Sequence, residues 1–301
     1  MNIRALWKDD FGGIAIRRAL ENGIKLNNRY KILVSLGRGG FGLTYLCEDL
    51  KTGEYVAVKE FFPTGAVRRD SSVELPSNSE WNNTFEKIEH FLEEAELISS
   101  LNDPRIVKVL KAFKENKTAY YVMEFIQGKT LRKYVNERGY LSDLEIKELI
   151  DEIGKGLQVI HSKGILHGDL KPSNILITDD ERAVKITDFG AASSIGTLYR
   201  GLIGNIVSKH YSAPERFTQE MILTVQSDIY SMGAIIYFMV TGQDPLPATN
   251  RLKGEKMKFP PASKKLKKVI ERSMKLLPQN RFPNVKTLLK YLDSPIRYLF
   301  S

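Results

Sequence analysis

The chain of 301 residues is 42% hydrophobic and 27% charged, with a net charge of +9, and this composition suits a protein with one large or two modest cores. Its one cysteine, Cys47, excludes an intramolecular disulfide framework, and the longest apolar run, from Gly233, is far shorter than the ~20 residues of a membrane-spanning helix. The first ten residues lack the apolar stretch of a signal peptide, so we expect a cytoplasmic protein.

The first part of the chain is predicted to be rich in strands. Residues 1–28 precede the strands and are expected to form an N-terminal extension. From Tyr30 to Met123, β-branched and aromatic residues form several strand-like stretches. An amphipathic helix is expected over residues 85–101, and it ends before Pro104 because proline disfavours helix at the residue before it.

Two features of this strand-rich part have a structural interpretation. Cys47 lies in a strand-like stretch, so we expect a buried thiol rather than a reactive one. The polar segment between Pro63 and Asn83 is long for a connection and is predicted to be an insertion loop. Within this loop we expect the side chains of Arg68 and Arg69 to be solvated rather than bound to anions.

After Gly128 the pattern becomes helical. The stretch over residues 142–164 opens with Ser142, which is an N-cap residue, and Glu145 follows at the capping-box position. Further helices are expected at three places: residues 225–241, 263–276 and 284–292. The chain therefore predicts a small sheet-rich lobe followed by a larger helical lobe.

The positive charge is concentrated near the C-terminal end. Residues 251–290 carry 13 Lys or Arg and 2 Asp or Glu, a net charge of +11, so the other residues sum to −2. Apolar residues recur there at helical spacing, namely Leu266, Val269, Ile270 and Met274. We favour a solvated helix face over a surface for nucleic acid or another anionic partner, because aromatic residues for base stacking are not interleaved with the charges.

The first motif that carries chemistry is a glycine cluster, GRGGFG, which consists of Gly37, Arg38, Gly39, Gly40, Phe41 and Gly42. In a dinucleotide-binding fold such glycines open a helix. Here the strand-like sequence LTYLCED follows, which favours a hairpin whose backbone N–H groups face the phosphate oxygens of a nucleotide. A plain glycine-rich turn is the remaining alternative.

The second motif is VAVK, an apolar strand that ends in Lys59. Burying an ammonium group is costly unless it meets anions, and triphosphate oxygens or a carboxylate would serve. Glu93 and Glu94 both lie on the helix over residues 85–101. Neighbouring residues of a helix lie about 100° apart, so only one of the two is expected to face the lysine.

The third motif is HGDLKPSN at residues 167–174, followed by a DFG sequence that begins with Asp188. A strand-turn-strand between them would bring Asp169, Lys171, Asn174 and Asp188 together. Phosphoryl transfer needs Mg²⁺ on oxygen ligands, which Asn174 and Asp188 supply. It also needs a carboxylate that orients the attacking hydroxyl and accepts its proton, and Asp169 is placed for this role, while Lys171 would screen charge on the γ-phosphate.

In order and spacing these motifs, with SAPE at residues 212–215, resemble a eukaryotic-type serine/threonine protein kinase. They are most similar to a bacterial branch with a GGFGxTYL glycine loop, KEFFP after the strand lysine, and an HGD catalytic loop. The resemblance covers residues 29–292. It implies a bilobal α+β fold, with a small antiparallel-sheet N-lobe over 29–126 that binds nucleotide and a larger helical C-lobe over 127–301 that holds the catalytic and substrate-binding groups.

The resemblance also implies the reaction and its participants. The γ-phosphate of ATP would be transferred to Ser or Thr hydroxyls of protein substrates, and of the chain itself, with Mg²⁺ or Mn²⁺. Alignment with the family selects Glu94 as the partner of Lys59, with Glu93 as the second choice. Other residues assigned to the nucleotide by the resemblance are Thr44, Ala57, Met123, Glu124, Ile126 and Leu176. Glu215 would pair with Arg281, and Ser208 would bridge Asp169 and Lys171.

Two alternatives to a protein kinase remain. Small-molecule kinases of the aminoglycoside and choline type also use an HGD loop, but Lys171–Pro172, the SAPE segment and Ser208 favour a protein substrate. A catalytically weak scaffold of the kinase fold is disfavoured because Lys59, Asp169 and Asp188 are all retained.

Gly168 replaces the arginine of the commonest catalytic loop. In kinases with that arginine, its side chain clamps a phosphate on the activation loop. Glycine has no side chain for this task, so we expect activity that does not depend on an activation-loop phosphate.

Overall fold

Strands and helices are segregated along the chain. In the computed structural model one unit consists of Met1–Asn102 with Val107–Ile126, and the other of Asp103–Ile106 with Gln127–Ser301. The structure describes residues 18–39, 42–75, 84–181, 183–189, 192–195, 208–217, 222–259 and 262–294.

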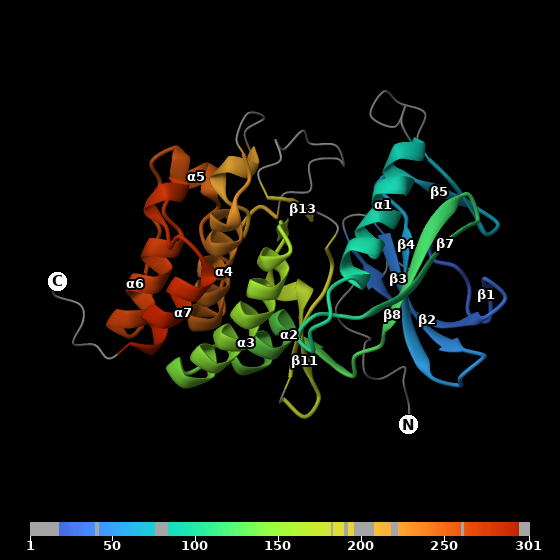
Figure 1. Ribbon diagram of the computed structural model, residues 1–301, viewed down its shortest axis with the longest axis horizontal. Coiled ribbons are helices and arrows are strands. Elements are labelled where there is room, and N and C mark those ends of the chain that lie inside the picture. Colours follow the sequence, from blue (N-terminus) through green and yellow to red (C-terminus); the bar gives the residue numbers. More distant parts are fainter. Residues whose placement is uncertain are drawn as a thin grey trace. The chain divides into compact units, whose positions relative to one another are not determined.

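The first unit contains a six-stranded antiparallel sheet with the order β1-β2-β3-β4-β8-β7, a helix and a separate hairpin (Figure 1). The sheet strands are β1 (Lys25–Leu26), β2 (Tyr30–Arg38), β3 (Gly42–Asp49), β4 (Tyr55–Phe61), β7 (Val109–Glu115) and β8 (Thr118–Glu124). The helix is α1 (Thr84–Ser99), and the hairpin is β5 (Val67–Arg69) with β6 (Ser72–Glu74). The hairpin lies inside the segment that the sequence predicts as an insertion loop.

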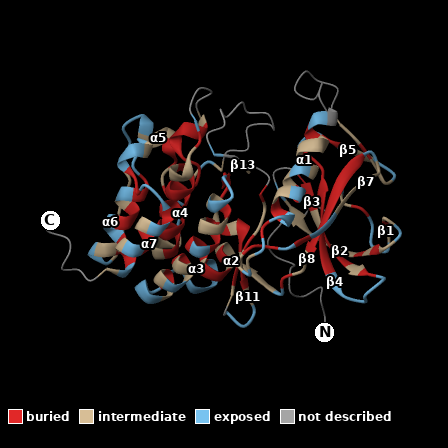
Figure 2. Ribbon diagram, viewed as in Figure 1, coloured by how far each residue is buried: buried red, intermediate tan, exposed pale blue. Residues whose placement is uncertain are grey.

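Strand β8 is buried on both faces, which explains its continuous run of apolar and aromatic residues (Figure 2). Successive side chains of a strand point to opposite faces of the sheet. Tyr120 and Val122 belong to a buried core cluster that includes Tyr45. Tyr121 instead stacks on Phe91 of α1, with ring centroids 5.0 Å apart. The sheet therefore has a core on one face and α1 on the other.

Residues 18–28 lie against this core. Leu20 and Leu26 are buried in the cluster, and β1 pairs with β2. The backbone N–H of Leu20 donates a hydrogen bond of 3.2 Å to the hydroxyl of Tyr45. This part of the segment that the sequence predicts as an extension is thus packed on the sheet, while residues 1–17 lie outside the described residues.

The second unit is mainly helical. Its helices are α2 (Leu131–Arg138), α3 (Asp143–Ser162), α4 (Val225–Thr241), α5 (Ala248–Leu252), α6 (Lys264–Ser273) and α7 (Val285–Asp293). Its strands are β9 (Gly128–Thr130), β10 (Ile165–Leu166), β11 (Ile175–Thr178), β12 (Val184–Ile186) and β13 (Ser193–Ser194), which form the sheets β12-β11-β9 and β10-β13. Short 3₁₀ turns occur at Pro172–Asn174, Pro214–Phe217 and Pro278–Asn280.

The five helices predicted from periodicity are confirmed as α1, α3, α4, α6 and α7. At the start of α3, the hydroxyl of Ser142 accepts from the N–H of Glu145, and the carboxylate of Glu145 accepts from the N–H of Ser142, so the predicted capping box is present. Helix α4 runs through the middle of the unit and is buried along most of its length (Figure 2). None of the described helices combines the length and apolar character of a membrane span.

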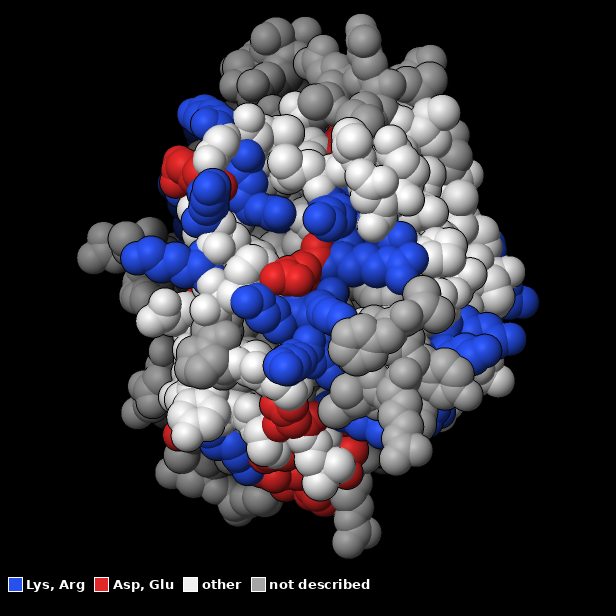
Figure 3. Space-filling view, turned by 90° about the vertical axis from the view of Figure 1, so that its left-hand side faces the viewer, with Lys and Arg blue, Asp and Glu red and all other residues white. Residues whose placement is uncertain are grey.

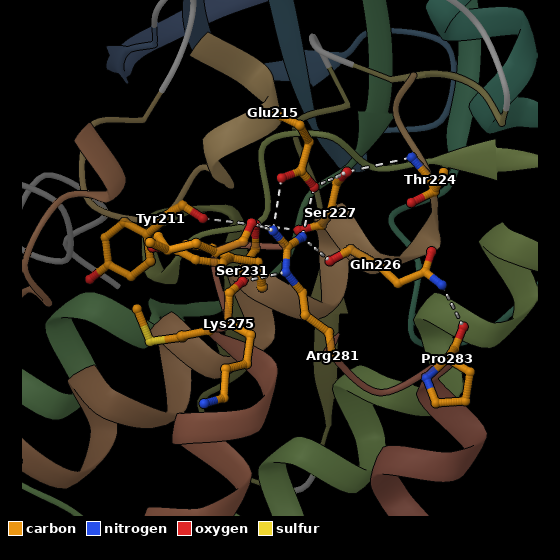
Figure 4. A network of polar contacts seen from close by, with 12 residues as sticks. Tyr211, Glu215, Thr224, Gln226, Ser227, Ser231, Lys275, Arg281 and Pro283 are labelled. Atoms are coloured by element: carbon orange, nitrogen blue, oxygen red, sulfur yellow. Dashed lines mark hydrogen bonds and ion pairs between the residues drawn. The ribbon is translucent and has the colours of Figure 1, made fainter. Parts of the chain in front are cut away.

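A buried ion pair joins distant parts of the second unit (Figure 4). The guanidinium of Arg281 donates to both carboxylate oxygens of Glu215, at 2.7 and 2.8 Å, and both side chains are at most 1% exposed. Its remaining hydrogen bonds go to backbone carbonyls, from Nε to Lys275, from Nη1 to Gln226 and from Nη2 to Leu276. The predicted bidentate pair is confirmed, and its full set of partners is what makes such burial tolerable.

Candidate active site

The glycine cluster forms the hairpin between β2 and β3. Gly37 pairs with Thr44 and Arg38 with Leu43, and the N–H of Gly39 donates to the carbonyl of Gly42 at 2.9 Å. A strand, not a helix, therefore follows the glycines, which rules out the dinucleotide-binding alternative. Gly40 and Phe41, at the tip, lie outside the described residues.

Gly42 and Arg38, at the base of this hairpin, both contact neighbouring parts of the sheet. A Cβ atom on Gly42 would lie 1.9 Å from the carbonyl oxygen of Glu60, so only glycine allows β3 to approach β4 here. The Arg38 guanidinium lies over the Phe62 ring, 5.8 Å from its centroid, and makes a long hydrogen bond of 3.5 Å to the carbonyl of Pro63.

Lys59 and Glu94 form the ion pair that the family resemblance implies. The ammonium of Lys59 lies 3.7 Å from Oε1 of Glu94, and the two side chains are 5% and 10% exposed. The Tyr121 hydroxyl also donates to this oxygen at 3.3 Å, and the Lys59 ammonium lies 5.3 Å from the centroid of the Tyr121 ring. Glu93, the second choice, has a side chain that is 68% exposed and contacts His90. Helix phase thus selects Glu94.

Glu60, next to Lys59 on β4, points to the opposite face of the sheet and is completely buried. Its carboxylate accepts hydrogen bonds from Tyr45 at 2.6 Å, from Tyr120 at 2.7 Å and from the guanidinium of Arg68 at 2.5 Å. The Arg68 side chain is only 8% exposed. The prediction that Arg68 is solvated is therefore wrong, because the hairpin of the insertion folds back onto the sheet, whereas Arg69 is 75% exposed as predicted.

The residues assigned to adenine occupy regular positions in their own units. Ala57 of β4 pairs with Met123 of β8, and both are buried. Thr44 of β3 pairs with Lys59, and Glu124 and Ile126 lie at and just beyond the end of β8. Leu176 lies on β11 of the other unit.

In the second unit, Asp169 is held by two side chains. Oδ1 of Asp169 accepts a hydrogen bond from the hydroxyl of Ser208 at 2.5 Å, and Oδ2 accepts one from the ammonium of Lys171 at 2.6 Å. Lys171 also donates to the Ser208 oxygen at 3.1 Å, which closes the triangle. The predicted bridge is confirmed. Charge-assisted bonds of this kind hold a carboxylate in one orientation.

Asn174 and Asp188 are brought together by the turn between β11 and β12. The amide nitrogen of Asn174 donates to the backbone carbonyl of Asp169 at 2.9 Å, and its Oδ1 accepts a long hydrogen bond of 3.4 Å from the Ser173 hydroxyl. The N–H of Thr187 donates to the carbonyl of Asn174 at 3.0 Å, and Asp188 follows with a left-handed φ of +66°. Such backbone strain is characteristic of functional positions.

This donor set fits a hard cation. An amide oxygen and a carboxylate are ligands that Mg²⁺ accepts, and Mg²⁺ usually keeps several further ligands from water or phosphate. No group of three or more His, Cys, Asp or Glu side chains suited to a metal occurs among the residues that the structure describes.

The catalytic loop is shaped by Asp228, a buried residue of α4. Its carboxylate accepts from the backbone N–H groups of His167 and Gly168, both at 2.9 Å, and from the ring of His161 at 2.8 Å. Gly168 has φ of +75°, a conformation that glycine adopts without strain. Gly168 thus contributes its backbone conformation and its N–H group to the structure of the loop.

The surroundings of Asp228 also set protonation states. Burial tends to raise the pKa of the Asp228 carboxyl, but the hydrogen bonds from the His161 ring and the Gly168 N–H hold it below its ordinary value. Burial lowers the pKa of His167, so this ring is neutral near neutral pH. The His167 ring packs on Phe189 with centroids 4.7 Å apart.

In the first unit, burial raises the pKa of the Cys47 thiol to about 12, as expected for an unreactive cysteine.

Sequence reasoning missed the group of Glu60, Tyr45, Tyr120 and Arg68. Its signal was the pair Lys59–Glu60 at the end of an apolar strand, since two adjacent charged residues there must point to opposite faces. It also missed α2, whose sequence is polar, although Thr130 caps it by accepting from the N–H of Lys133.

Comparison with known proteins agrees with this geometry. The sequence profile of the protein kinase domain matches residues 30–293. A probable serine/threonine-protein kinase of Clostridium perfringens is 32% identical over 280 residues, which cover 89% of this chain and 38% of that protein. PknB of Lactococcus lactis, named a probable serine/threonine-protein kinase, is 36% identical over 223 residues, 72% of this chain and 32% of that protein.

PrkC of Bacillus subtilis, a serine/threonine-protein kinase, is 33% identical over 227 residues, 74% of this chain and 32% of that protein. Among solved structures, the apo form of PpkA-294 superposes with a TM-score of 0.78 at 25% identity, covering 92% of this chain and all of that one. The chain spans less than half the length of these three curated relatives.

Proposed function

The chain belongs to the protein kinase family, and from that membership we propose that it is an active serine/threonine kinase that transfers the γ-phosphate of ATP to protein hydroxyls, including its own. The observation that carries this proposal is the triangle of Asp169, Lys171 and Ser208. A carboxylate fixed at both oxygens is ready to orient a hydroxyl without first reorganising.

In the proposed mechanism, Asp169 accepts a hydrogen bond from the acceptor Ser or Thr and takes its proton as the new O–P bond forms. Lys171 stabilises the negative charge on the phosphoryl group in flight. Ser208 keeps Asp169 oriented and lies in the segment that docks the substrate. Lys59, held by Glu94, neutralises phosphate oxygens of the nucleotide.

We propose that the cofactor is Mg²⁺, with Mn²⁺ as a substitute, and that Asn174 and Asp188 hold it. When bound, the ion neutralises the charge of the β- and γ-phosphates. Backbone N–H groups of the glycine-rich hairpin, residues 37–42, would face the same phosphates. We assign Thr44, Ala57, Met123, Glu124 and Ile126 of the first unit to adenine, and Leu176 of the second unit to the nucleotide as well.

The finer classification is also a proposal. We assign the chain to the bacterial branch with the GGFGxTY glycine loop and the HGD catalytic loop, with residues 1–28 as an extension, 29–126 as the N-lobe and 127–301 as the C-lobe. A cytoplasmic location, where ATP is available, agrees with the buried free thiol of Cys47.

The test is transfer of labelled phosphate from ATP with Mg²⁺ to a generic protein acceptor, in the wild type and in Asp169→Asn. We expect the substitution to lower the rate by about 10³-fold or more, since it removes both the base and its charge. Equal activity in the two would overturn the catalytic assignment. Aminoglycoside and choline acceptors, assayed in parallel, test the small-molecule alternative, and a nucleotide-induced rise in melting temperature without turnover would indicate a scaffold.

Because Gly168 has no side chain, it bears on how the activity of the enzyme is switched on. We propose that activity needs no activation-loop phosphate, since no arginine at this position clamps one. Treatment with a phosphatase should leave the rate within about threefold of the untreated enzyme, and a loss beyond about tenfold would contradict the proposal.

A further inference from the structure

The charged residues in the first turn of α6 destabilise the helix. Its first turn carries Lys264, Lys265 and Lys267 and no acidic residue, although the N-terminal end of a helix favours negative charge. In the same unit, α3 follows the ordinary rule, with Asp143 and Glu145 in its first turn. The N-terminal charges of α6 thus oppose the helix dipole.

Like charges on the exposed side of α6 also repel one another. Lys264, Lys268 and Arg272 are exposed and follow one another at intervals of four residues, so like charges are neighbours along the helix surface. The buried side, with Leu266 and Val269, accounts for the packing of the helix. Arg272 also lies over the Phe282 ring, 4.4 Å from its centroid, while the neighbouring like charges of the row repel one another.

These cations also lack counterions. Nine lysines and arginines are exposed on α6, on α7 and on the segment 253–258, and none of them has an ion pair with a described residue. Some exposed cations elsewhere in the unit are paired, for example Lys155 with Asp151 and Arg138 with Glu181. A concentration of unpaired cations within these three segments suits an anionic partner.

The three segments lie on one side of the second unit, where Figure 3 shows Lys and Arg side chains gathered across the middle of the view. The Lys267 ammonium lies 5.6 Å from the centroid of the Phe259 ring, so the segment after α5 lies beside α6. Lys265 donates to the carbonyl of Ser294 at the end of α7. We call this set of exposed cations the basic face.

Two exposed leucines border the basic face at one end of α6. Leu252 and Leu277 are 54% and 52% exposed. Arg251 donates to the carbonyl of Met274 at 2.7 Å, which brings the end of α5 and the end of α6 together. Apolar side chains next to cations suit a lipid bilayer, where they enter the interface, but they gain nothing from a phosphate backbone in water.

We propose that the basic face docks the kinase onto a membrane surface that contains anionic lipids. The lysines and arginines bind the lipid headgroups, and Leu252 and Leu277 enter the boundary between headgroups and acyl chains. Docking would place the catalytic groups near substrates held at the membrane. This inference does not depend on the catalytic proposal, because binding is measured without turnover.

The experiment is cosedimentation of the chain with vesicles of phosphatidylcholine alone or mixed with phosphatidylglycerol. We expect binding to the mixed vesicles only, weakening as salt increases. The variant Lys264→Gln/Lys268→Gln/Arg272→Gln should bind them at least about tenfold more weakly. The control Lys51→Gln/Lys108→Gln/Lys111→Gln, which removes three exposed cations of the other unit, should bind within about twofold of the wild type.

Further measurements separate a lipid surface from nucleic acid as the partner of the basic face. The basic-face variant should keep its rate on a soluble substrate. Leu252→Gln/Leu277→Gln should weaken binding to the mixed vesicles. No binding to phosphatidylglycerol vesicles would overturn the proposal, as would equal losses in the two triple variants. Tighter binding of duplex DNA at the same salt, unaffected by the leucine substitutions, would assign the face to nucleic acid instead.

Discussion

Arg68 and Glu60 form a buried ion pair with a separation of 2.5 Å, and it joins the insertion hairpin to the strand that carries Lys59. The Arg68 guanidinium also lies over Phe62, 4.8 Å from the ring centroid, and donates to the carbonyls of Arg18 and Ser71. The Arg68 side chain thus attaches the insertion to the sheet, together with Val73, whose N–H donates to the carbonyl of Asn116 at 2.9 Å.

Arg68→Met should destabilise the first unit by about 3–5 kcal/mol, because it leaves the Glu60 carboxylate buried without its cation. Arg69→Met is the matched control: its partner Glu74 is on the surface, so the cost should be below about 1 kcal/mol. Urea unfolding measures both. The double variant Glu60→Gln/Arg68→Met should recover part of the loss, and equal effects of the two single substitutions would contradict this account.

Glu94→Gln should lower kcat/KM by about 10- to 100-fold, because a neutral amide holds the Lys59 ammonium less strongly than a carboxylate does. Glu93→Gln changes the next residue of the same helix, which is exposed, and should leave the rate unchanged. Steady-state kinetics with varied ATP measures both variants. If Glu93→Gln were as slow as Glu94→Gln, the assignment of the pair to catalysis would fail.

Ser208→Ala should lower kcat by about 10-fold or more, since it removes one of the two side chains that orient Asp169. Ser208→Thr retains the hydroxyl and should keep most of the rate. Rescue by threonine distinguishes hydrogen bonding from packing. A threonine variant as slow as the alanine variant would show that the hydroxyl is not what matters.

Gly168→Ala should lower stability by about 1–2 kcal/mol, because φ of +75° is strained for a residue with a Cβ atom. Gly164→Ala, at a φ of +74° outside the catalytic loop, should have a similar cost. Thermal melting compares the two. An unchanged melting temperature in Gly168→Ala would mean that the backbone conformation does not explain this glycine.

Arg29→Gln should destabilise the protein at neutral pH, and this difference should shrink as pH falls below the ordinary aspartate pKa of about 3.9. The two hydrogen bonds from Arg29, of 2.7 and 2.6 Å, hold the pKa of the Asp49 carboxyl below its ordinary value. A lowered carboxyl pKa stabilises the folded state above the ordinary pKa, and that stabilisation is lost as pH falls through the lowered value. Melting temperatures of both proteins across this range test the prediction, which a pH-independent difference would contradict.

The sequence by itself determined the family resemblance, the order of the elements and the identity of most chemical groups. These follow from local patterns: the spacing of GRGGFG, VAVK, HGDLKPSN and DFG, and the periods of strands and helices. Five of the helices were predicted because an amphipathic repeat is visible within a single segment. The buried pair of Glu215 and Arg281 was predicted only through the family resemblance.

The tertiary structure alone decided which residues meet across long separations. Glu93 and Glu94 are equivalent by composition, and the phase of α1 against β8 separates them. Arg68 lies in a polar segment whose sequence predicts a solvated side chain, but the hairpin brings this side chain into an ion pair with Glu60. Strand register and helix packing depend on residues distant in the sequence, so no local pattern contains them. Where the family resemblance gave no partner for a buried charge, as for Arg68, the partner could be identified only from the folded chain.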